Sequence, residues 1–173
     1  MSEPVELGPA PSLESLVGLR LSIIRRAVDM LILQFGAIRE TRTRKGKLAY
    51  VGELSVHISG SWRIDGPEKT IVGQEDLHAF AGAEKPDNWT YQNGNTRLDA
   101  KLDATFPFDA QGWRPSDDGF TVASVDMSRY GDLSIGFVND VAIRAFPSYT
   151  EYECWRLFEP GGKTDHLVVP DHD

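Results

Sequence analysis

The sequence of 173 residues contains only one cysteine, Cys154. A lone cysteine cannot form an internal disulfide, and it cannot supply the paired thiolates of a structural zinc site. A nucleophilic thiol would need a neighbouring histidine or a helix N-terminus, and the sequence around Cys154 indicates neither. We therefore expect a buried, unreactive thiol.

Long apolar runs are also missing. The longest nearly apolar stretch, AVDMLILQFG over residues 27–36, is too short to cross a bilayer and contains Asp29. The first twelve residues, MSEPVELGPAPS, have neither the basic region nor the apolar region of a secretory signal. The expectation is a cytoplasmic protein with no membrane association.

Positive charge is scarce. Lys and Arg total 18 against 26 Asp and Glu, which gives a formal net charge of −8. Such a surface repels phosphate backbones, so we do not expect nucleic-acid binding. The exception is residues 39–47, where five basic residues surround Gly46 and predict the tip of an exposed hairpin. Arg42, Arg44 and Lys45 are candidates for contacting a partner, and the alternative is a strand edge kept soluble by charge.

The short motifs that carry a mechanism are absent, among them the dinucleotide fingerprint, the P-loop, the HExxH zinc motif and the GxSxG elbow. The segment QEDLH places Glu75, Asp76 and His78 close together, and with His166 these groups would suit zinc or manganese. An exposed polar loop is the alternative, because no second ligand pair has a recognisable spacing. We therefore name no catalytic residue, expect neither metal nor cofactor, and favour a protein that is not an enzyme.

The chain is long enough for one domain with a substantial core. We expect a disordered leader over residues 1–11, a single domain over 12–169 and a frayed tail over 170–173. Short β-rich runs gather at both ends of the chain around one helical segment, NTRLDAKLDATF at 95–106. This order predicts an α+β fold with a mostly antiparallel, curved sheet, one main helix and a short N-terminal helix, and a partial barrel is the alternative form.

Several local features sharpen this prediction. Residues 19–35 are rich in Ile, Leu and Val and favour two strands, with a helix over 22–34 as the competing interpretation. Leu98 and Leu102 lie four apart on one face of the main helix. The segment 66–95 predicts a long loop, and long ordered loops often carry function.

Two Trp-Arg pairs stand out, in SWRIDGP at Trp62–Arg63 and in CWRLFEPGG at Trp155–Arg156. On a strand each Trp faces one side and each Arg the other, so the plain interpretation is two buried Trp and two outward Arg side chains. The functional alternative places both Arg side chains on one sheet face, where they would bind a carboxylate or a phosphate. The flanking sequences do not match, which argues against an internal repeat.

Taken together, these segments resemble a group of bacterial proteins, common in actinobacteria, for which no activity is established. The pattern runs Trp-Arg-Ile, Val-Gly-x-x-Asp-Leu and Trp-Arg-Leu-Phe-x-Pro-Gly and covers most of residues 19–169. Its matching positions here are Gly52, Glu53, Trp62, Arg63, Ile64, Gly73, Asp76, Leu77, Asn95, Asp99, Trp155, Arg156, Phe158, Pro160, Gly161 and His166. Gly60-Ser61 replaces a Cys-Pro that accompanies the first Trp in this pattern.

Two functional hypotheses follow. By analogy with short acidic bacterial proteins that act as immunity proteins, the first is a non-enzymatic, immunity-like module that binds another protein. The second is a small-molecule or anion binder, or an enzyme, with a site built from Arg63, Asp76, His78, Arg156 and His166. The sequence gives no indication of the oligomeric state.

Overall fold

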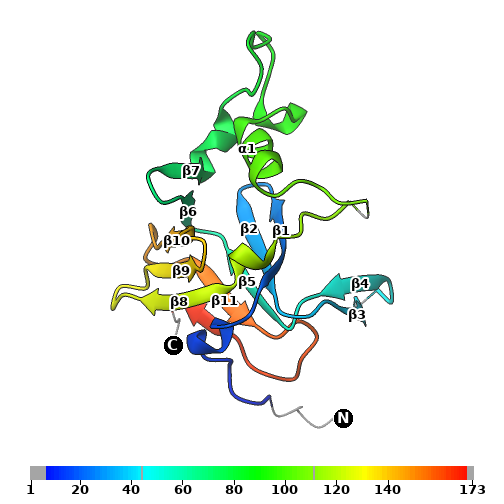
Figure 1. Cartoon of the computed structure of the whole chain (residues 1–173), viewed down its shortest axis with the longest axis vertical. Coiled ribbons are helices and arrows are strands. Elements are labelled where there is room, and N and C mark those ends of the chain that lie inside the picture. The colour runs from blue at the N-terminus through cyan, green and yellow to red at the C-terminus, as the bar shows by residue number, and fades with distance from the viewer. Residues whose placement is uncertain (1–6, 44, 111, 171–173) are drawn as a thin grey trace.

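The computed structural model describes residues 7–43, 45–110 and 112–170, and the description below concerns these residues (Figure 1). It confirms the α+β fold with mostly antiparallel strands and one main helix. In chain order the elements are η1 (Leu13–Leu16), β1 (Leu21–Ala27), β2 (Met30–Phe35), β3 (Arg39–Arg42), β4 (Leu48–Val51), β5 (Leu54–Ile58), β6 (Ser61–Asp65), β7 (Thr70–Gly73), η2 (Gln74–His78), η3 (Tyr91–Asn93), α1 (Arg97–Thr105), η4 (Asp118–Phe120), β8 (Val122–Met127), β9 (Leu133–Phe137), β10 (Ala142–Phe146), β11 (Trp155–Phe158) and β12 (Leu167–Val169). The η elements are 3₁₀ turns.

The strands form two five-stranded antiparallel sheets, which here are called the first and the second sheet. The first has the order β1-β2-β5-β11-β12, and the second has the order β7-β6-β10-β9-β8. The two sheets remain separate, so the alternative of a barrel is not realised among the described strands. The hairpin β3–β4 forms a two-stranded sheet of its own.

The strands predicted over residues 19–35 are confirmed, and the competing helix is wrong. The break between them is a tight turn at Val28-Asp29, directly after Arg25-Arg26-Ala27, which still belong to β1. Val28 has φ 57°, and Ala27 pairs directly with Met30 across the turn. A β-branched residue at positive φ is uncommon, so this turn is set by its surroundings and not by local preference.

The chain passes from the first sheet to the second at Ser59-Gly60, between β5 and β6. Strand β5 pairs with β11 in the first sheet, whereas β6 pairs with β10 in the second. The main-chain N–H groups of Ser59 and Gly60 both donate to the carbonyl of Cys154, at 2.7 and 2.9 Å. This shared acceptor ties the turn to the start of β11.

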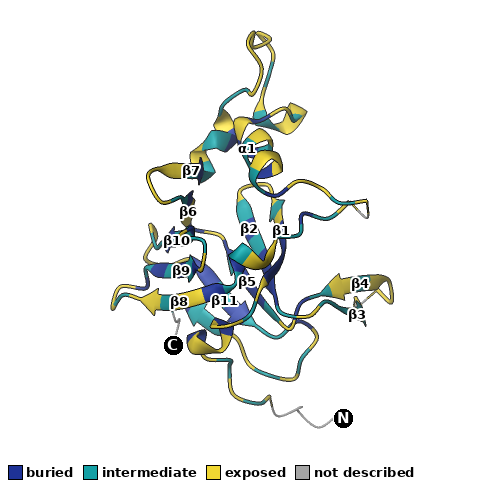
Figure 2. Cartoon of the chain, viewed as in Figure 1, coloured by how far each residue is buried: buried dark blue, intermediate teal, exposed yellow. Residues whose placement is uncertain are grey.

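The core is one cluster of buried side chains that come from both sheets, and Figure 2 shows the buried positions in dark blue. Trp62 and Ile64 on β6 and Trp155 and Leu157 on β11 are all buried, whereas Arg63 is exposed on its strand. The plain interpretation of the two Trp-Arg pairs is therefore confirmed. Each indole also satisfies its N–H as buried indoles usually do: Trp62 donates to the carbonyl of Asp29 and Trp155 to that of Gly131, both at 2.8 Å.

Helix α1 lies at the predicted place and is capped by Thr96, whose hydroxyl accepts the N–H of Asp99 at 3.1 Å. Its buried side chains are Leu98 and Leu102, as their spacing predicts. Asp99 also accepts two hydrogen bonds of 2.6 Å from Arg26 of β1, which joins the helix to the first sheet. This hydrogen bonding holds the pKa of Asp99 below its usual value.

The ends of the expected domain are partly described. Of the leader expected over residues 1–11, residues 1–6 lie outside the described part, and Gly8 forms an isolated parallel bridge with Thr164. Of the expected tail, residues 171–173 lie outside it. Among the described helices, none has the length and apolar character needed to cross a membrane.

Candidate functional site

The structure brings together two of the five candidate ligand-binding residues, Arg156 and His166. Nη1 of Arg156 lies 3.3 Å from Nδ1 of His166, on the outer face of the first sheet. His166 stacks on Phe158 with ring centroids 4.7 Å apart, and His57 meets the same Phe158 edge-on at 4.9 Å. Because His57 pairs with Arg156 across β5 and β11, these groups form one continuous cluster.

The other three candidates lie elsewhere. Arg63 is on the second sheet, where it donates to Asp65 at 3.0 Å and lies over the ring of Phe146. The expectation that Arg63 and Arg156 share a sheet face is therefore wrong, because β6 and β11 belong to different sheets. The sequence spacing alone does not reveal that the chain changes sheet before Trp62.

Asp76 and His78 lie in η2, which packs against helix α1. The Asp76 carboxylate accepts from Nζ of Lys101 at 2.7 Å and from the N–H of Gly73 at 2.9 Å, so it caps η2 and pairs with the helix. His78 meets Tyr91 edge-on at 5.2 Å. Over the described residues, no group of three or more His, Cys, Asp or Glu side chains has a metal-binding arrangement.

The basic hairpin candidates are placed in part. Arg42 and Lys45 are exposed near the tip of β3–β4, and Arg42 donates to the carbonyl of Gly46 at 3.0 Å. Arg44 lies outside the described residues. The hairpin is joined to the rest of the molecule by Tyr50, whose ring packs against Trp113 at 5.3 Å.

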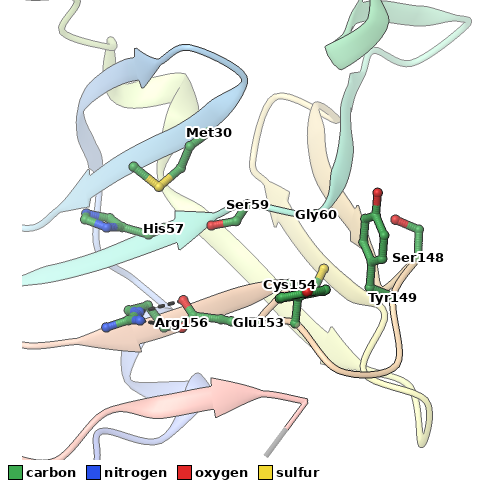
Figure 3. Close-up of a pocket in the computed structure, with 10 residues that line it drawn as sticks. Met30, His57, Ser59, Gly60, Ser148, Tyr149, Glu153, Cys154 and Arg156 are labelled. Carbon is green, nitrogen blue, oxygen red and sulfur yellow. Dashed lines mark hydrogen bonds and ion pairs between the residues drawn. The ribbon is translucent and has the colours of Figure 1, made fainter.

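A pocket of about 600 Å³ lies beside the Arg156 cluster, where the change of sheet at Ser59-Gly60 opens a gap in the surface. Figure 3 shows its lining, with β2, β5 and β11 on one side and the loop between β10 and β11 on the other. The lining residues are Met30, His57, Ser59, Gly60, Ser148, Tyr149, Tyr152, Glu153, Cys154 and Arg156. This volume is in the usual range for ligand sites, roughly 300–1,000 Å³.

Two tyrosines on the loop between β10 and β11 form the outer wall of the pocket. Tyr149 and Tyr152 are 66% and 68% exposed, and their rings meet edge-on with centroids 5.8 Å apart. Most of their apolar surface is therefore in contact with water. Each tyrosine combines a large apolar ring with a hydroxyl, which is the surface chemistry typical of protein interfaces.

The charged groups of the pocket are paired with each other. Glu153 accepts two hydrogen bonds from Arg156, the Nε bond being 2.6 Å, and this raises the pKa of Arg156. Burial lowers the pKa of His57, and the positive charges of Arg156 and Arg25 lower it further. Near neutral pH this part of the pocket holds an internal ion pair and a neutral imidazole, with little net charge.

Cys154 forms the floor of the pocket and is buried, as expected. Burial raises the pKa of its thiol to about 11, so the sulfur carries its proton at neutral pH. Gly60 lies directly against it: a Cβ added at Gly60 would lie 3.2 Å from Cβ of Cys154 and closer still to Sγ. The floor is therefore a closely packed contact between two chain segments.

Sequence reasoning missed Met30, Tyr149, Tyr152 and Glu153 as pocket residues. Their one visible signal is the run SYTEYE at 148–153, which places two aromatic residues in an otherwise polar segment after Pro147. A large aromatic side chain in a polar loop has no local core to join. That these residues face Met30 of β2 depends on the pairing of distant strands.

Comparisons with known proteins identify no relative. No protein family matches the chain, and no similar protein was found among curated proteins or among solved structures.

Proposed function

We propose that the protein is a non-enzymatic binding module that recognises another protein through the pocket beside Arg156 and the loop that carries Tyr149 and Tyr152. The observation that supports this most directly is the pair of tyrosines at the rim, each about two-thirds exposed although packed together. Rings held in this way lose little conformational freedom on binding. They therefore suit the centre of an interface.

The chemistry of the pocket supports binding over catalysis. The Cys154 thiol is buried and protonated at neutral pH, so it is a weak nucleophile there. Glu153 and Arg156 neutralise each other, which leaves neither as a free acid or a free cation. Such groups fix the shape and polarity of a surface without supplying a nucleophile or a general base.

The net charge of −8 favours a basic partner, since complementary charge speeds association and disfavours acidic competitors. An immunity-like role, in which the module blocks a basic toxin, is one specific form of this proposal. This form rests on the net charge of the chain and on the analogy with short acidic bacterial immunity proteins.

The test is site-specific cross-linking. A photoreactive amino acid placed at position 149 or 152 should join the protein to the same partner in cells, and placed at the exposed Val17 it should not. The double variant Tyr149→Ala/Tyr152→Ala should lose the purified partner while keeping its melting temperature, because the two rings contribute little to the core. Equal cross-linking from all three positions would contradict the proposal.

A small molecule in the same pocket is the second candidate, and the volume of about 600 Å³ favours it. Of the five residues expected from the sequence, Arg156 lines this pocket, and His166 lies beside Arg156 without lining it. Native mass spectrometry of the protein from its host separates the candidates: a bound molecule of a few hundred daltons supports the second and a bound protein supports the first.

A further inference from the structure

The pocket beside Arg156 continues into a second, smaller hollow of about 190 Å³. The two share Ser59, Gly60, Ser148 and Tyr149 as lining residues, so they adjoin each other at the change of sheet, and together they are here called the groove. The shared middle part consists mainly of small residues. Small side chains leave the backbone accessible, and this suits an extended chain lying in the groove.

The two ends of the groove differ in chemistry. One end has the apolar surfaces of Met30 and Tyr152 beside the neutralised Glu153–Arg156 pair. The other end is lined by Asp29 and Glu75, which are both exposed. Neither of these two carboxylates forms an ion pair with any residue that the structure describes.

Asp29 and Glu75 are held in place by their backbones. Asp29 belongs to the β1–β2 turn, and its carbonyl accepts the indole N–H of the buried Trp62 at 2.8 Å. Glu75 belongs to η2, whose first residue, Gln74, reaches the Asp29 carboxylate at 3.5 Å. The turn and η2 are therefore neighbours, and Asp29 and Glu75 line the same hollow.

From this arrangement, and resting on the proposed function, we infer that the groove binds an extended basic segment of the partner protein. A Lys or Arg side chain of that segment lies between Asp29 and Glu75, and an apolar side chain lies against Met30 and Tyr149. Charge complementarity selects this occupant, because the acidic end would repel a phosphate or a carboxylate. At the opposite end Arg156 is already paired with Glu153.

The experiment is a selection of random dodecapeptides displayed on phage against the folded protein, followed by binding measurements on the enriched peptides. The expected peptides contain a Lys or Arg at a fixed spacing from an aromatic or aliphatic residue. Replacing that basic residue by citrulline or norleucine should weaken binding about five- to tenfold at low salt. In the variant Asp29→Asn/Glu75→Gln the same replacement should change nothing.

The outcomes separate this inference from the proposed function. If the enriched peptides need Tyr149 and Tyr152 but contain no required basic residue, the inference of a basic segment is wrong and the proposed binding function still stands. If no peptide is enriched more strongly on the parent protein than on the Tyr149→Ala/Tyr152→Ala variant, both the basic segment and the proposed binding function are overturned. The variant Asp29→Asn/Glu75→Gln keeps the Asp29 carbonyl that accepts from Trp62, and a melting temperature within about 2 °C of the parent's confirms that the fold is unchanged.

Discussion

Gly60 and Cys154 are packed so closely that no side chain fits at Gly60. The main-chain N–H of Gly60 donates to the carbonyl of Cys154, and the sulfur lies over the glycine where a Cβ would stand. This contact fixes the point where the chain leaves the first sheet, and it forms the floor of the pocket. The requirement for glycine here is one of space, because the constraint comes from a neighbouring side chain.

The first prediction follows from this contact. Gly60→Ala should lower the free energy of unfolding by about 1–3 kcal/mol, because a methyl group overlaps Sγ of Cys154. Cys154→Ala removes that sulfur, so the double variant should lose less stability than the sum of the two single variants. Urea unfolding measures the coupling between the sites. Strict additivity would show that the sulfur is not what excludes a side chain at Gly60.

The second prediction concerns the reactivity of the only thiol. Burial raises the pKa of Cys154 to about 11, so at pH 8 the native protein should react with an aromatic disulfide reagent at least tenfold more slowly than the urea-unfolded chain. The native rate should rise as the pH approaches 11. Because the unfolded thiol ionises near pH 8.5–9, the stability of the fold should fall as pH rises through this interval. Equal rates for native and unfolded chains would contradict the burial argument.

The third prediction concerns His57. Its pKa is lowered in the folded protein, so the unfolded chain binds this proton more tightly, and protonation favours unfolding. The free energy of unfolding should therefore increase with pH up to about 6.5, the usual histidine pKa, and then level off. In the variant His57→Gln, the free energy of unfolding should increase less steeply with pH between about pH 5 and 7, as urea unfolding at several pH values would measure.

A second variant tests the causes of that shift. Burial is the larger cause and the charge of Arg156 the next, so Arg156→Met should restore only part of the histidine's usual pKa. NMR titration of the His57 ring in the parent and in this variant measures the difference. Complete restoration in the variant would mean that charge, and not burial, dominates.

The fourth prediction concerns the turn at the acidic end of the groove. Val28 has φ 57° and an exposed side chain, so it carries backbone strain without contributing to the core. Val28→Asn should raise the free energy of unfolding by up to about 1 kcal/mol, because asparagine tolerates this conformation. Val17→Asn is the matched control, since Val17 is also exposed but has φ −61°. If the free energy of unfolding rises in both variants, the effect comes from surface polarity and not from relief of backbone strain.

Much of the local structure could be predicted from the sequence. The alternation around Trp62 and Trp155 places each Trp inside and each Arg outside, because side chains alternate along any strand whatever its neighbours are. The spacing of Leu98 and Leu102 and the cap at Thr96 locate helix α1 for an equally local reason.

The candidate site could not be predicted in the same way. Arg63 and Arg156 have equivalent local patterns, yet one lies on the second sheet and the other on the first. The pocket combines Met30, His57, Tyr149 and Glu153, which come from elements far apart in the chain. No periodicity encodes which distant strands will pair.

The sequence by itself thus determined most elements of this protein, the inward face of each strand, the buried thiol and the acidic balance of charge. Residues 66–95 are the exception, because β7, η2 and η3 form where a long loop is predicted. Only the tertiary structure decided that the chain changes sheet at Gly60, that Tyr149 and Tyr152 line the resulting pocket, and that Asp29 and Glu75 line the adjoining hollow. The physical reason is the range of the interactions involved. Burial patterns and caps act within a few residues, whereas strand pairing and close packing join residues more than a hundred positions apart.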